Sequence, residues 1–111
     1  MRVKLIEIAE VIRSKNSGPY ELTLDIIFRT PDIFLKVLNQ NIITHKLIAG
    51  LYRVKIEDVL AIIVFEPAKA IKINLKRPLA SGDLGETDVY GAQQHAPLLD
   101  LELDLDLEGI G

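Results

Sequence analysis

Apolar side chains recur at every second position in residues 20–29, 69–76 and 99–108. This period is typical of strands that turn one face toward a core, so three strands are predicted here. The last segment is the most regular, because an acidic residue follows each leucine from Leu99 onward. In the first two segments, the residues expected to face inward are Leu22, Leu24, Ile26, Ile71, Ile73 and Leu75.

An unbroken apolar run, VLAIIVF, occupies residues 59–65. A run without polar positions indicates a central strand that is buried on both faces. Glu66-Pro67-Ala68 then turns the chain, and the next strand begins almost at once. Because the connection is short, the two strands are expected to pair antiparallel.

Two helices are predicted between residues 30 and 52. Thr30 has the chemistry of an N-cap, and Pro31 suits the first helical position. Thr44 is expected to cap a second, shorter helix. The buried stripes of the two helices are Ile33, Phe34, Val37 and Leu38, and Leu47, Ile48 and Leu51.

Residues 3–12 fit two interpretations. Leu5, Ile8, Ala9 and Ile12 share one helical face, with Gly18 as a possible terminator, which favours a helix. The many β-branched residues also allow a strand. If the segment is a helix, residues 13–19 form the loop after it.

The order of these elements predicts an α+β fold, a ferredoxin-like sandwich of a mostly antiparallel sheet with helices on one face. The length of 111 residues fits a single domain over residues 1–111.

The apolar content is 49%, but aromatic residues make up only 5%. A small domain has too little interior for so many aliphatic side chains, so a homo- or hetero-oligomer is expected. No apolar run approaches the roughly 18 residues that cross a membrane. The first residues lack the apolar core of a signal peptide, and there is no cysteine, so a cytoplasmic protein is expected.

The net charge of −3 is unevenly distributed. Five acids follow Leu99, which leaves 11 acidic against 13 basic residues elsewhere. This balance is too weak for nucleic-acid binding. The acidic alternation lacks the glycine turn of a calcium loop, so it is interpreted as a solvent face that prevents edge aggregation. Lys72 and Lys76, on a neighbouring strand, would offset its self-repulsion. No metal or cofactor is expected.

The first candidate binding site is the segment Arg13-Ser14-Lys15-Asn16-Ser17-Gly18. Its cations and glycine could form a nest for a carboxylate or phosphate, but the local sequence alone favours a solvated helix end. Asp25 lies mid-strand among apolar residues. If its side chain points inward it needs a partner, and a cation from this segment is the obvious one. If it points outward, the position is an ordinary one for an aspartate.

The second candidate site combines Asp88, Tyr90, Gln93, Gln94 and His95. Histidine can act as an acid or base near neutral pH, with Asp88 to orient it and Tyr90 to supply a hydroxyl. The alternative is structural, with the glutamines bonding loop backbone and His95 packed under a proline. A single histidine is weak evidence for metal, and a metal site is rejected.

Three motifs carry a family resemblance: Arg-Ser-Lys-Asn-Ser-Gly-Pro at 13–19, Leu-Thr-Leu-Asp-Ile-Ile-Phe at 22–28, and Asp-Val-Tyr-Gly-Ala-Gln-Gln-His-Ala-Pro-Leu-Leu at 88–99. They resemble the small-protein family known as domain of unknown function 4387, which is associated with proteins of the acyclic terpene utilisation A (AtuA) type. The chain is also similar to the ferredoxin-fold domain that ends longer AtuA-type proteins. Those proteins carry Arg-Ser-Gly-Asp-Lys-Gly at the place of residues 13–18. The resemblance implies a fold and a large partner, but no catalytic residue.

The preferred hypothesis is therefore an accessory subunit that docks onto an AtuA-type subunit, in an enzyme acting on a small carboxylate or acyl substrate. A second hypothesis is a self-sufficient homo-oligomeric enzyme, with His95 as acid/base and Arg13 with Lys15 holding an anion. A third is a binding module for a small anion.

Overall fold

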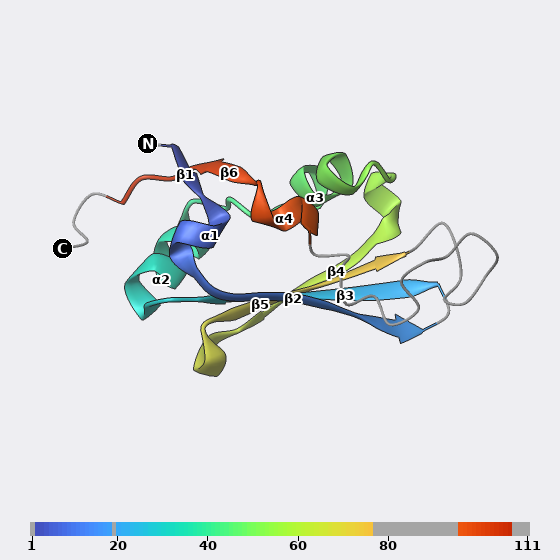
Figure 1. Ribbon diagram of the computed structural model, residues 1–111, viewed down its shortest axis with the longest axis horizontal. Helices are drawn as coiled ribbons and strands as arrows, with labels where there is room; N and C mark the ends of the chain where they lie inside the picture. The colour runs from blue at the N-terminus through green and yellow to red at the C-terminus, as the bar shows by residue number, and fades with distance from the viewer. Residues whose placement is uncertain (1, 19, 77–95, 108–111) are drawn as a thin grey trace.

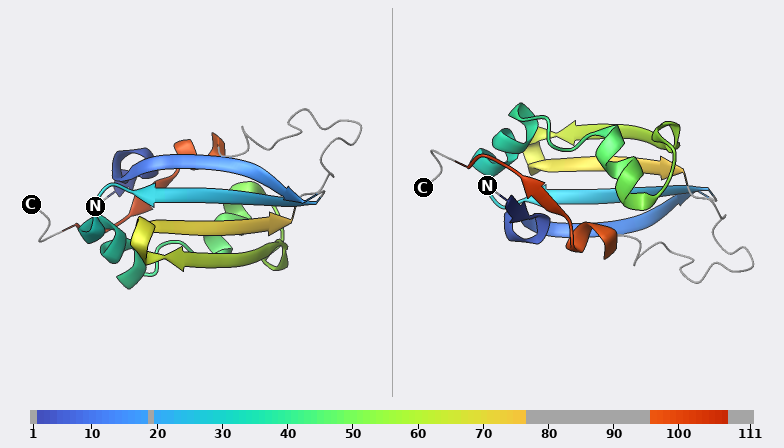
Figure 2. Two further views of the ribbon diagram at one scale, coloured as in Figure 1. Left: turned by 90° about the horizontal axis from the view of Figure 1, so that it is seen from below. Right: turned by 90° about the horizontal axis from the view of Figure 1, so that it is seen from above.

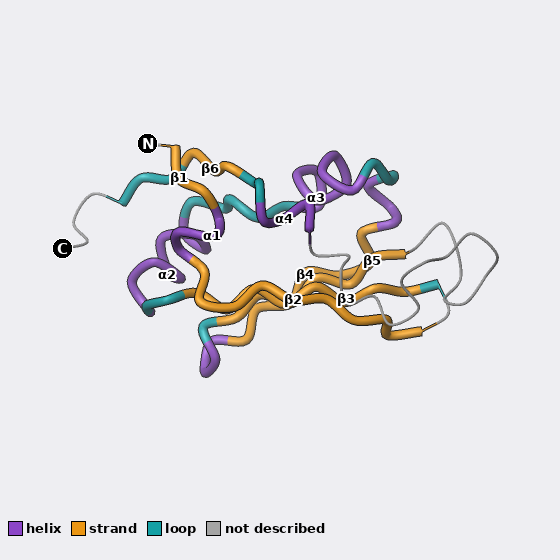
Figure 3. The backbone as a smooth tube through the Cα atoms, in the orientation of Figure 1, coloured by secondary structure: helices purple, strands orange, loops and turns teal. Residues whose placement is uncertain are grey.

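The computed structural model describes residues 2–18, 20–76 and 96–107. Figure 1 shows a sheet with helices stacked above it, and Figure 3 shows the same path coloured by secondary structure. The elements in chain order are β1 (Arg2–Lys4), α1 (Leu5–Ile8), β2 (Ala9–Gly18), β3 (Glu21–Phe28), α2 (Pro31–Asn39), α3 (His45–Tyr52), η1 (Ile56–Asp58), β4 (Val59–Phe65), η2 (Glu66–Ala68), β5 (Ala70–Lys76), α4 (Ala96–Leu99) and β6 (Glu102–Asp104).

The main sheet has four strands in the order β2-β3-β5-β4, and every neighbouring pair is antiparallel. A separate two-stranded sheet pairs β1 with β6. Seen from below, no helix crosses in front of the four main strands, whereas the view from above shows the helices and the small sheet covering them (Figure 2). The uncovered side is called the open face from here on.

The core lies between the covered face and the helical layer. Every second residue of β3 and β5 is buried there, because the side chains of a strand alternate between its two faces. Phe28 of β3 packs on Phe34 of α2, with ring centroids 6.0 Å apart. The strand residues that the core takes in are Leu22, Leu24, Ile26, Phe28, Ile71, Ile73 and Leu75.

The expected α+β sandwich, with a mostly antiparallel sheet and helices on one face, is thus confirmed. The predicted helix starts are also confirmed, because Thr30 accepts a hydrogen bond from the Ile33 amide and Thr44 from the Leu47 amide. The order β3, α2 and α3, β4 is a split βαβ unit, because β3 and β4 run in the same direction with β5 between them. The fourth strand, β2, joins the sheet through a hairpin with β3, and every neighbouring pair of strands in the main sheet is antiparallel.

The helix favoured for residues 3–12 is wrong for most of its length, since only Leu5–Ile8 is helical. The loop expected at residues 13–19 is wrong as well, because β2 continues to Gly18. The apolar residues nonetheless point inward as expected. Leu5, Ile8 and Ala9 are buried, but one helical turn and the start of a strand bury them together.

The central position expected for residues 59–65 is also wrong. β4 is an edge strand of the sheet, and four of its seven residues are exposed. A continuous apolar run predicts burial on both faces only when layers cover both faces. Here the helices cover one face, and the open face leaves Ile63 and Phe65 46% and 57% exposed.

The leucine–acid alternation near the C-terminus is confirmed as a burial pattern, although only Glu102–Asp104 is a strand. The expected pairing beside Lys72 and Lys76 is wrong, since β6 pairs with β1 in the small sheet. Arg2 supplies the opposite charge instead, with Nη2 3.2 Å from Glu102 Oε2. The buried leucines are Leu101, Leu103 and Leu105.

Candidate functional site

A charged row crosses the open face at right angles to the strands. Arg13 of β2 is paired with Asp25 of β3, Asp25 with Lys72 of β5, and Lys72 with Ile63 of β4. Directly paired residues of neighbouring strands point to the same side of a sheet. Four strands therefore each contribute one side chain to a single line, in which the carboxylate of Asp25 has one cation on each side.

Arg13 and Asp25 form an ion pair, with Nε 3.2 Å from Oδ2. The arginine side chain is 63% exposed and the aspartate side chain only 14%. The carboxylate of Asp25 is thus mostly buried between its neighbours, whereas the guanidinium of Arg13 is exposed to solvent. Asp25 thus points to the open face and not into the core, and its partner there is Arg13.

An apolar row lies next to the charged one. Ile27 of β3 is paired with Ala70 of β5, and Ala70 with Phe65 of β4. Between the two rows is a hollow of about 420 Å³. This open-face hollow is lined by Arg13, Asp25, Ile27, Ile63, Phe65, Ala68, Ala70 and Lys72. It combines an apolar wall with a charged side that carries an excess of one positive charge.

A polar row follows on the other side of the charged one. Thr23 Oγ1 donates to Asn74 Oδ1 at 2.9 Å, across the β3–β5 pair. Thr23 is 4% exposed, and it is the one buried polar residue in the part of the chain that the structure describes. Its bond holds β3 and β5 in register directly beside Asp25 and Lys72.

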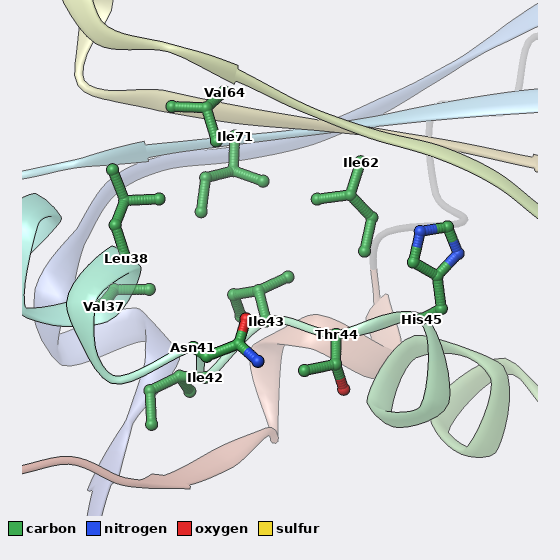
Figure 4. Close-up of a pocket in the computed structure, with 10 residues that line it drawn as sticks. All are labelled: Val37, Leu38, Asn41, Ile42, Ile43, Thr44, His45, Ile62, Val64 and Ile71. Atoms are coloured by element: carbon green, nitrogen blue, oxygen red, sulfur yellow. The ribbon is translucent and has the colours of Figure 1, made fainter.

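A second hollow, of about 460 Å³, lies on the covered side of β4 (Figure 4). Figure 4 shows that Ile62, Val64 and Ile71 form its upper wall and that the α2–α3 connection forms the lower one. Its polar groups are Asn41, Thr44 and His45; the hydroxyl of Thr44 already caps α3. The lining is otherwise aliphatic, so this hollow suits an uncharged apolar group.

His45 is held at the edge of this second hollow, with Nδ1 3.0 Å from the carbonyl oxygen of Val59. A carbonyl can only accept, so Nδ1 carries a proton in this contact, and a neutral ring then offers Nε2 as an acceptor. The bond ties the start of α3 to the start of β4. This hydrogen bond gives the His45 side chain a structural role in the fold.

Strand β4 separates the two hollows, and no other described strand pairs with its outer side. Ile63 and Phe65 point to the open-face hollow, while Ile62 and Val64 point to the covered one. No charged residue lies between Val59 and Phe65, and Leu60 and Val64 are 46% and 44% exposed. This margin is the most apolar exposed edge among the described strands.

Burial also perturbs one titratable group away from these hollows. Tyr52, the last residue of α3, is largely enclosed by the helical layer. Desolvation raises the pKa of its phenol well above the usual range. The group is therefore protonated throughout the physiological range.

A family model described as a domain of unknown function (DUF4387) matches residues 5–102. The chain belongs to this family. The match spans every described element from α1 to the start of β6. No curated protein and no solved structure matches the chain.

Of the site residues predicted for this DUF4387 domain, the structure brings Arg13 and Asp25 into contact. Lys15 lies on the open face one row away, opposite Thr23, and Asn16 lies opposite the buried Leu22 and so turns to the covered side. The remaining candidates, Asp88, Tyr90, Gln93, Gln94 and His95, lie outside the described residues, as does any convergence of His95 with Arg13.

The sequence interpretation missed Lys72, Ile63 and Phe65 as members of the DUF4387 site. The alternation in residues 69–76 correctly turns Lys72 away from the core. Its neighbours on the open face follow from the order of the strands in the sheet, which that alternation does not contain. Across residues 2–18, 20–76 and 96–107, no group of three metal-ligating side chains is gathered. Within the same ranges, no helix has the length and apolarity to traverse a bilayer.

Proposed function

We propose that the chain is a small accessory subunit that associates with an AtuA-type protein, in an enzyme complex acting on a small carboxylate or acyl substrate. The observation that carries this proposal is the margin of β4, an uncharged and half-exposed apolar strand whose outer side pairs with no other strand in the described ranges. Natural edge strands are normally short, charged or covered, because an apolar edge pairs with other chains. An edge left in this state implies a partner.

The opposite edge of the sheet supports the choice of β4 as the docking strand. β2 carries Glu10, Arg13 and Lys15 along its length, so its edge is charged. Charges on an edge strand discourage further pairing. Only one of the two edges of the main sheet therefore has the composition of an interface.

Strand addition explains how the partner would dock. A strand of the partner would pair with the outer edge of β4, and its side chains would alternate between the two faces of the extended sheet. On one face they would meet the open-face hollow, and on the other face the aliphatic one. The partner would thereby cover Leu60, Val64 and Phe65, which the chain leaves exposed.

Co-expression with an AtuA-type protein and purification through a tag on one chain tests this proposal. We expect the wild-type pair to co-purify, and Leu60→Lys or Val64→Lys to abolish the association, because a lysine at the seam would be desolvated without a partner. Leu35→Lys is the matched control. Leu35 lies on α2 and is 46% exposed, the same fraction as Leu60.

Two results would overturn the proposal. One is association that survives both β4 substitutions. The other is a wild-type chain that sediments as a homo-oligomer, loses that state in Leu60→Lys, and has no affinity for the AtuA-type protein. The second result would favour the self-sufficient homo-oligomer.

A further inference from the structure

We propose that the open-face hollow is a binding site for a short aliphatic carboxylate, with the carboxylate between Arg13 and Lys72 and the hydrocarbon against Ile27, Ile63 and Phe65. The hollow would be the place on this chain where the substrate class of the proposed function binds, and the choice of that class rests on the proposed function. The binding itself is a property of the isolated chain.

The charge of the site calls for one anion. Arg13 and Lys72 carry two positive charges, and Asp25 between them carries one negative charge. A monovalent carboxylate would neutralise the remaining charge, whereas a phosphate dianion would leave the site negative. Lys72 is exposed and has no ion pair among the described residues.

The Arg13–Asp25 bond prepares the guanidinium for a second acceptor. Asp25 engages Nε, at 3.2 Å, and the arginine side chain is 63% exposed. A guanidinium has five N–H donors in a fixed plane, so a bond at Nε fixes the orientation of the terminal Nη groups without using them. Asp25 thus acts as a positioning residue, and Arg13 and Lys72 as the groups that touch the ligand.

The spacing of the row allows both cations to reach one carboxylate. Neighbouring strands lie roughly 4.8 Å apart, so the backbones at Arg13 and Lys72, two strands apart, are separated by about 10 Å. Arginine and lysine side chains are long enough to lean over the short Asp25 from both sides. A carboxylate above Asp25 would then lie between the two cationic ends.

The apolar wall determines what the carboxylate is attached to. Ile63 and Phe65 are 46% and 57% exposed, and Ile27 lies beside them across the sheet. Covering such apolar surface removes it from water, which favours binding of a hydrocarbon group. The volume of about 420 Å³ lies at the lower end of the range of ligand pockets, which favours a short chain.

The test is calorimetric titration of the isolated full-length chain with 3-methylbutanoate. We expect saturable binding, at least tenfold weaker binding of the uncharged isostere 3-methylbutanamide, and weaker binding of acetate and of inorganic phosphate. No binding of 3-methylbutanoate, or equal binding of the amide, would contradict the proposal.

Variants assign the binding to the hollow. Lys72→Met should weaken binding of 3-methylbutanoate about tenfold, and Lys46→Met, which changes another exposed lysine, on α3, should leave it unchanged. Equal loss in both variants would indicate non-specific charge attraction and would overturn the site. Ile63→Ser should weaken 3-methylbutanoate more than acetate.

The outcome is separable from that of the proposed function. Lys72→Met should still co-purify with the AtuA-type partner, because Lys72 lies on β5 and not on the edge. Leu60→Lys should lose the partner and still bind 3-methylbutanoate, because Leu60 does not line the hollow. Failure of one experiment therefore leaves the other intact.

Discussion

Arg13 and Asp25 stand directly opposite each other on β2 and β3, and their side chains meet with Nε 3.2 Å from Oδ2. The pair joins an edge strand to a central one on the face that no helix covers. Because Asp25 is largely buried and Arg13 is exposed to solvent, we expect the ion pair to orient the arginine on the open face and to add little to the stability of the fold.

A double-mutant cycle on this pair should measure a modest coupling. Arg13→Gln, Asp25→Asn and the double variant, compared by urea unfolding, are expected to give a coupling free energy of about 0.5–1 kcal/mol. The coupling should shrink in 1 M salt, since exposed charges are screened. The pair Arg2–Glu102, with side chains 68% and 46% exposed, should give a smaller value in the same cycle. A larger coupling for Arg2–Glu102 would contradict this ranking.

Removing the hydroxyl of Thr23 should destabilise the centre of the sheet. Thr23→Val keeps the shape but leaves Asn74 Oδ1 without its donor at 2.9 Å. The expected loss is about 1 kcal/mol in the free energy of unfolding, measured by urea denaturation. Thr23→Ser retains the donor and serves as the control for the bond. A Val variant as stable as wild type would show that water replaces the bond at no cost.

The leucine–acid alternation predicts that substitutions at a leucine and at an acid of this segment change stability by very different amounts. Leu105 is fully buried, so Leu105→Ala should cost about 2–5 kcal/mol through lost burial and the cavity it leaves. Asp100 is exposed, so Asp100→Ala should change stability by less than about 0.5 kcal/mol. Thermal or urea unfolding of the two variants compares them. Similar losses in both would be incompatible with the burial pattern.

Stability should fall at high pH because of Tyr52. Burial raises the pKa of this phenol above its usual value, so the folded state keeps the proton while the unfolded chain releases it near pH 10. Above pH 10 the unfolded state therefore binds fewer protons, and the free energy of unfolding decreases as the pH rises. Tyr52→Phe should make that decrease shallower between pH 10 and 11, as followed by urea denaturation. An unchanged slope in the variant would remove Tyr52 as its cause.

The sequence predicted the elements whose signals are local. Thr30 and Thr44 cap their helices as expected, since an N-cap bond spans only three residues. The faces of residues 22–28 and 70–76 were also predicted correctly, because the alternation of a strand requires no knowledge of its neighbours.

The elements predicted wrongly depend on the layers around them. Residues 59–65 are apolar on both sides, yet only one side is covered, and nothing within the run shows that it forms an edge. Residues 9–18 were divided between a helix and a loop, whereas they form one strand that pairs, among the described strands, with β3 alone. The contribution of Lys72 to the candidate site follows from the strand order, which the periodicity of one segment does not contain.

The pairing of β1 with β6 has a consequence for how the chain folds. Val3 lies opposite Leu103, and the Leu5 amide donates to the Leu101 carbonyl at 2.9 Å, so these contacts join residues that are far apart along the chain. Contacts so distant along the chain are closed late and slowly. During synthesis, the main sheet can therefore assemble while Val3 and Leu5 still await their cover. Pairing of β1 with β6 is then the step that covers these two residues.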